Sequence, residues 1–121
     1  MQNKLTLVFV YNADSGFFNL LTDAAHKMLS PATYDCNLCA LTHGHLGPKK
    51  QWREFLKTLD RPLEFLHADE LKNKYGITGQ KLPAIFTLTD GDKLAPLIDD
   101  ESINRCESLE QLKKLIEESL R

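Results

Sequence analysis

The sequence lacks the features of several large classes of protein. Its 121 residues carry 15 Lys and Arg against 17 Asp and Glu, a formal net charge of −2, with both signs mixed along the chain. This balance argues against binding to nucleic acid or to an anionic membrane surface. The longest apolar run, Leu5–Tyr11, is far too short to cross a bilayer. No secretory signal is visible at the start, so we expect a cytoplasmic protein without a membrane partner.

Motifs of the common cofactor-dependent enzymes are also missing. There is no G-x-x-x-x-G-K-[ST], no G-x-G-x-x-G and no H-E-x-x-H, so nucleotide hydrolysis, dinucleotide binding and zincin chemistry have no support. We therefore predict no bound cofactor. The cysteines number three, and an odd number in a chain with no export signal argues against a disulfide scaffold. With 42% apolar residues, the chain can form one self-sufficient domain over residues 1–121.

Strand-like and helix-like segments alternate along the chain. Apolar, β-branched runs predict strands, and apolar residues spaced three and four apart predict helices. The alternation indicates an α/β fold, with a mixed sheet between two layers of helices and a hairpin near the C-terminus. The predicted strands are Leu5–Tyr11, Tyr34–Thr42, Leu63–Leu66, Leu82–Leu88 and Lys93–Ile98, and the predicted helices are Phe17–Leu29, Pro48–Leu59, Ala68–Tyr75 and Ser108–Leu120.

The second half of the chain resembles thioredoxin-like proteins. The resemblance rests on Lys74–Ile77, on Leu82–Phe86 and on the turn Asp90–Gly91, in that order. It implies a cis-proline at Pro83, a β-hairpin and a capped C-terminal helix. The region 34–60 then corresponds to an inserted strand and helix. The segments VFVYNADSGFF and CNLCALTHG are also similar to a small group of uncharacterised bacterial proteins, which implies no activity.

One departure from the thioredoxin pattern concerns the cysteines. Those proteins carry a redox C-x-x-C where the first strand meets the first helix, whereas the corresponding residues 12–16 contain no cysteine. The C-x-x-C of this chain, Cys36 and Cys39, comes some twenty residues later. If Tyr34–Thr42 is a strand, the two side chains face opposite sides of the sheet and cannot form a disulfide with each other.

Three interpretations of the cysteine pair remain open. They are small buried apolar residues, a displaced redox pair, or half of a zinc site. The zinc site would consist of Cys36, Cys39, His43 and His45, since two thiolates and two imidazoles suit tetrahedral zinc. It requires residues 36–45 to fold as a knuckle, which an extended strand excludes.

A second candidate site lies where the predicted parallel strands end. Ligands bind beyond the carboxyl ends of such strands, and these ends would bring together Asp14, Ser15, His43, His45 and Pro83. A histidine there could act as an acid or a base near neutral pH, oriented by Asp14. In the structural alternative, Asp14 or Ser15 only caps a helix and both histidines are solvated.

These observations lead to three functional hypotheses. The first is a non-redox thioredoxin-like domain that binds an extended peptide or a protein along the Pro83 edge. The second is a thiol–disulfide oxidoreductase that uses Cys36 and Cys39. The third is a small zinc-binding module. An edge strand in so small a domain also permits a homodimer.

Overall fold

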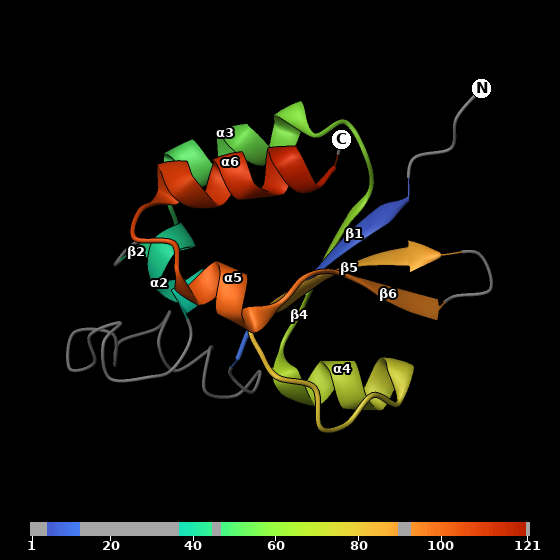
Figure 1. Cartoon of the computed structure of the whole chain (residues 1–121). Helices are drawn as coiled ribbons and strands as arrows, with labels where there is room; N and C mark the ends of the chain where they lie inside the picture. Colours follow the sequence, from blue (N-terminus) through green and yellow to red (C-terminus); the bar gives the residue numbers. More distant parts are fainter. Residues whose placement is uncertain (1–4, 13–36, 45–46, 90–92, 121) are drawn as a thin grey trace.

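A mixed four-stranded sheet with helices on both faces forms the centre of the molecule (Figure 1). The computed structural model describes residues 5–12, 37–44, 47–89 and 93–120. The strands within these ranges are β1 (Thr6–Val10), β2 (His43–Gly44), β3 (Gly47–Pro48), β4 (Leu63–Leu66), β5 (Ala84–Thr89) and β6 (Lys93–Ile98). The helices are α2 (Asn37–Thr42), α3 (Lys50–Thr58), α4 (Ala68–Tyr75), α5 (Asp100–Asn104) and α6 (Leu109–Ser119).

The strand order in the sheet is β4-β1-β5-β6. Strand β1 runs parallel to β4, with Val8 opposite Glu64. It runs antiparallel to β5, with Val8 opposite Phe86. Strands β5 and β6 pair antiparallel, as the predicted hairpin requires. The predicted α/β class with a mixed sheet is confirmed. The turn Asp90–Gly91 and the predicted helix Phe17–Leu29 lie outside the described residues.

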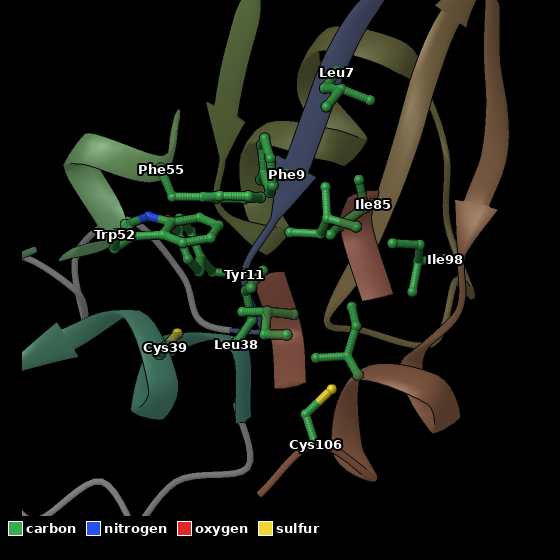
Figure 2. Close-up of a cluster of buried hydrophobic side chains, with 13 residues drawn as sticks. Leu7, Phe9, Tyr11, Leu38, Cys39, Trp52, Phe55, Ile85, Ile98 and Cys106 are labelled. Atoms are coloured by element: carbon green, nitrogen blue, oxygen red, sulfur yellow. The ribbon is translucent and has the colours of Figure 1, made fainter. Parts of the chain in front are cut away.

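Alternate side chains of β1 enter two separate cores, because successive residues of a strand point to opposite faces. Leu7, Phe9 and Tyr11 pack in the larger core (Figure 2). Val8 and Val10 pack in the smaller one. The larger core includes residues of α2, α3, α5 and α6, namely Leu38, Cys39, Trp52, Phe55, Ile103, Leu112 and Ile116. The smaller core includes Leu71 of α4, which lies on the other side of the sheet in Figure 1.

Helix α4 has the predicted bounds, and α6 lies within one residue of its predicted bounds at each end. The backbone N–H of His67 donates to Glu70 Oε1 at 2.8 Å before the first turn of α4. Gly76 ends that helix in the left-handed region, at φ 69°, which a residue without Cβ adopts at little cost. The hydroxyl of Ser108 accepts the N–H of Gln111 at 3.2 Å, as the predicted N-cap of α6 requires.

The prediction of a strand over Tyr34–Thr42 is wrong where the structure describes it, because Asn37–Thr42 form helix α2. Leu38, Cys39 and Thr42 are its buried residues, and their spacing of one, three and four fits one face of a helix rather than alternation. A short apolar run cannot be assigned to helix or strand from periodicity alone. Pro48, predicted in the first turn of a helix, lies in β3 instead.

Two phenylalanines on the same face of the sheet should differ sharply in their contribution to stability. Phe9 is fully buried and meets the Trp52 ring edge-on at 5.7 Å, whereas Phe65, on the edge strand β4, is 39% exposed. We expect Phe9→Ala to lower the free energy of unfolding by about 3–5 kcal/mol. Phe65→Ala should cost about 1 kcal/mol, because that ring is only partly removed from water. Urea denaturation measures both values, and equal losses would contradict the full burial of Phe9 against a partly exposed Phe65.

Candidate functional site at the carboxyl end of β1

Tyr11 follows β1 and brings an aromatic hydroxyl into the interior. Its backbone N–H donates to the Leu66 carbonyl at 2.9 Å, which extends the parallel pairing by one residue. The side chain is only 4% exposed. Two imidazole rings lie beside it, with ring centroids 5.6 Å away for His43 and 6.0 Å away for His67. A phenol and two imidazoles therefore gather at one end of the central strand.

The Thr42 hydroxyl connects this group to helix α2. It is fully buried and donates its single proton to the Leu38 carbonyl at 2.7 Å. The Tyr11 hydroxyl is hydrogen-bonded to it, and His43 Nδ1 lies 2.8 Å from its oxygen. Since the Thr42 proton is committed to Leu38, both Tyr11 and His43 donate to the two lone pairs of the Thr42 oxygen. This pattern assigns the proton of neutral His43 to Nδ1 and leaves Nε2 as the basic nitrogen.

Burial sets the protonation of both rings. It raises the pKa of the Tyr11 hydroxyl well above its usual range, against the smaller opposing effect of the Thr42 hydrogen bond. It lowers the pKa of His43 to about 4, with smaller contributions from the nearby His67 and Lys49. At neutral pH the site therefore holds a protonated phenol and an uncharged imidazole.

Cys39 lies in the first turn of α2 and is disulfide-bonded. Its side chain is 2% exposed and belongs to the same core as Tyr11 and Leu38. Cys106 is the free cysteine, and burial raises the pKa of its thiol. Figure 2 shows Cys39 on the Tyr11 and Trp52 side of this core and Cys106 on the Ile98 side. Because Cys39 lies in a helix, the strand geometry that argued against a bridge between Cys36 and Cys39 does not apply.

Pro83 directly precedes β5 and lies at the same end of β1. The Leu82–Pro83 peptide bond is cis, and Pro83 is buried. The next residue, Ala84, is the partner of Val10 in the antiparallel pairing of β1 and β5. Pro83 thus lies at the sheet end where Tyr11 meets His43.

Among the residues of the predicted ligand site, the structure brings His43 and Pro83 to the end of β1. Asp14, Ser15 and His45 lie outside the described residues, as does Cys36. The neighbour expected to run parallel to β1 was Tyr34–Thr42, but β4 takes that place. Strand β4 ends at Leu66, which pairs with Val10 at the end of β1. The next residue, His67, therefore lies at this end of the sheet.

The zinc hypothesis required thiolate ligands at Cys36 and Cys39 together with His43 and His45. In the disulfide form the Cys39 sulfur is not a thiolate, so it does not serve as a zinc ligand. Within the ranges 5–12, 37–44, 47–89 and 93–120, no three His, Cys, Asp or Glu side chains form a group that could hold a metal ion. Zinc binding by the reduced protein stays a prediction.

Sequence reasoning missed Tyr11, Thr42 and His67 as site residues. Tyr11 reads as the last apolar residue of a strand, and Thr42 as the end of a predicted strand. A usable signal existed for His67, because it directly follows the predicted strand Leu63–Leu66. Residues after parallel strands meet at one edge of a sheet, which should have placed His67 beside Tyr11.

Comparisons of the chain with protein-family models, with curated protein sequences and with solved structures find no match. In the part of the chain that the structure describes, every helix is too short or too polar to cross a membrane.

The protonation of His43 can be measured directly. An NMR titration should give a pKa near 4 for this ring, against 6.5 for an exposed histidine. Between pH 6.5 and pH 4 the unfolded chain binds a proton that the folded chain does not, so stability falls as the pH falls. The contribution of His43 is at most about 1.4 kcal/mol per pH unit.

The control for this titration is His43→Asn, whose amide can still donate to Thr42 but does not titrate. The difference in unfolding free energy between the two proteins should be independent of pH above 6.5 and should shrink below it. A His43 resonance that titrates near 6.5 would show that the ring is solvated.

Proposed function

We propose that this chain is a thioredoxin-like thiol–disulfide oxidoreductase whose redox pair is Cys36 and Cys39. The observation that carries the proposal is the disulfide of Cys39 in the first turn of α2, beside the end of the central strand. The sequence holds three cysteines and Cys106 is free, so the proposal assigns Cys36 as the partner. This favours the redox hypothesis over a purely binding role.

The arrangement of the sheet supports the thioredoxin-like part of the proposal. The antiparallel pairing of β5 and β6, at the edge of a mixed sheet, fits the hairpin that the resemblance implies. Pro83 before β5 and the final helix α6 fit the resemblance as well. Although it comes late in the sequence, Cys39 lies near the end of β1, because α2 packs in the same core as Tyr11.

The burial of Cys39 assigns the roles of the two thiols. At 2% exposure its sulfur is poorly accessible to a macromolecular substrate, so Cys36 attacks the substrate disulfide and Cys39 resolves the mixed disulfide. One substrate S–S bond is broken and two substrate S–H bonds form. The two electrons and two protons come from the Cys36 and Cys39 thiols, which close their own S–S bond.

The Pro83 edge is the proposed contact surface for the substrate. Residues 81–83 precede β5 without belonging to a strand, and they lie at the sheet end shared with Tyr11. An extended peptide can form main-chain hydrogen bonds to such a segment. The oxidoreductase hypothesis and the peptide-binding hypothesis then place the partner on the same surface. They differ only in whether the cysteines react with it.

Reversible closure of the disulfide tests the redox proposal. After incubation with oxidised glutathione, mass spectrometry of the alkylated protein should show two cysteines protected and one modified. The reduced protein should also reduce insulin. Cys36→Ser and Cys39→Ser should abolish the reductase activity, whereas the matched control Cys106→Ser should retain it. The proposal would be wrong if the wild-type chain formed no disulfide with Cys39.

Trapping with a peptide whose cysteine is held in a disulfide tests the contact surface. The Cys36 thiolate displaces one thiol of that peptide disulfide, and Cys39→Ser removes the resolving thiol, so the mixed disulfide with Cys36 should accumulate. In the trapped complex we expect NMR shift changes at the backbone amides of Lys81, Leu82 and Ala84. The variant without Cys36 and Cys39 should bind the same peptide at least tenfold more weakly, since the covalent bond is lost. Equal binding would favour the non-redox hypothesis instead.

A further inference from the structure

Asn37, the residue that follows Cys36 in the C-x-x-C, links α2 to the C-terminal part of the chain. Its Nδ2 atom donates to the Ile103 carbonyl at 2.8 Å and to the Cys106 carbonyl at 2.9 Å. Both amide hydrogens are therefore used, and both acceptors lie at or just beyond the end of α5. The contact joins residues 66 and 69 positions apart in sequence.

The two acceptors belong to a well-fixed part of the molecule. Ile103 is fully buried in the larger core, and the Cys106 N–H donates to its carbonyl at 3.1 Å. The Cys106 thiol in turn lies 3.6 Å from the Ser102 carbonyl. Carbonyls at a helix end have no partner within the helix, and Asn37 supplies donors to this end of α5. The first turn of α2 is thus held on a rigid support.

We infer that Asn37 is a positioning residue for the redox pair, whose hydrogen bonds stabilise the dithiol form more than the disulfide form. This inference rests on the proposed oxidoreductase function. In the disulfide form, the covalent bond of Cys39 restrains the first turn of α2, so the Asn37 bonds are partly redundant. Reduction removes that restraint, and the amide bonds to Ile103 and Cys106 then hold the turn.

A purely structural role makes a different prediction. If Asn37 only fixed α2 to α5, its loss would destabilise both redox forms equally, and the disulfide equilibrium would not change. If Asn37 stabilises the dithiol form more than the disulfide form, its loss must shift the equilibrium between the two forms. This follows because the two redox forms and their unfolded states make a closed thermodynamic cycle. The equilibrium with glutathione therefore separates positioning from simple packing.

The experiment compares four full-length chains in buffers of defined reduced and oxidised glutathione. Asn37→Ala removes the amide, and Asn37→Asp keeps its shape and suits the first turn of a helix but removes both donors. Asn104→Ala is the matched control, since Asn104 is an exposed residue of α5. After alkylation, mass spectrometry gives the ratio of disulfide to dithiol for each chain.

We expect both Asn37 variants to raise this ratio about threefold to tenfold over the wild type. A change of this size is smaller than the net contribution of two ordinary hydrogen bonds to stability. Asn104→Ala should leave it unchanged. An unaltered or lowered ratio in both Asn37 variants would overturn the inference even if wild-type disulfide exchange is normal. Failure of the proposed function looks different, because the wild-type chain itself would then form no reversible disulfide. Should Asn37→Ala not fold, Asn37→Asp alone decides the question.

Discussion

Burial of β1 on both faces is the constraint on which the other elements depend. From Leu7 to Val10 every side chain is fully buried, so both faces of the strand need an apolar cover. Both of its edges also need a hydrogen-bonded neighbour, since unpaired backbone groups away from water are costly. Strands β4 and β5 pair with the edges, α4 covers one face, and the remaining described helices contribute to the other. The same constraint governs Tyr11, whose buried hydroxyl must find a partner inside the protein.

Helix α2 is fixed at both ends by polar groups. At its end, Thr42 accepts hydrogen bonds from Tyr11 and His43 while donating to Leu38. At its start, Asn37 donates to two carbonyls of the C-terminal region. Cys39 lies between these two attachments. A six-residue helix has little stability of its own, so its position depends on these side chains and on the burial of Leu38.

The elements that the sequence predicts correctly carry local signals. The β-branched run of β1 and the glycine after α4 decide their structure within a few residues. Helix α2 has no such signal, because Leu38, Cys39 and Thr42 suit either a helix or a strand face, and contacts with distant parts of the chain decide between them. The site residues depend on the same distinction. Parallel strands end at one edge of a sheet, but the parallel neighbour of β1 is β4 and not the predicted strand Tyr34–Thr42, so it is His67 that lies beside Tyr11.

The place of β1 in the sheet also bears on how the chain is made. Strand β1 precedes both of its partners in the sequence, yet it lies between them in the sheet, and one of these neighbours, β5, starts only at Ala84. Until then a flat, uncharged strand has one edge open, which is the kind of edge that pairs with other chains. Synthesis that stops before β5 would therefore release a fragment prone to aggregate, and translation through β5 is the step that removes this hazard.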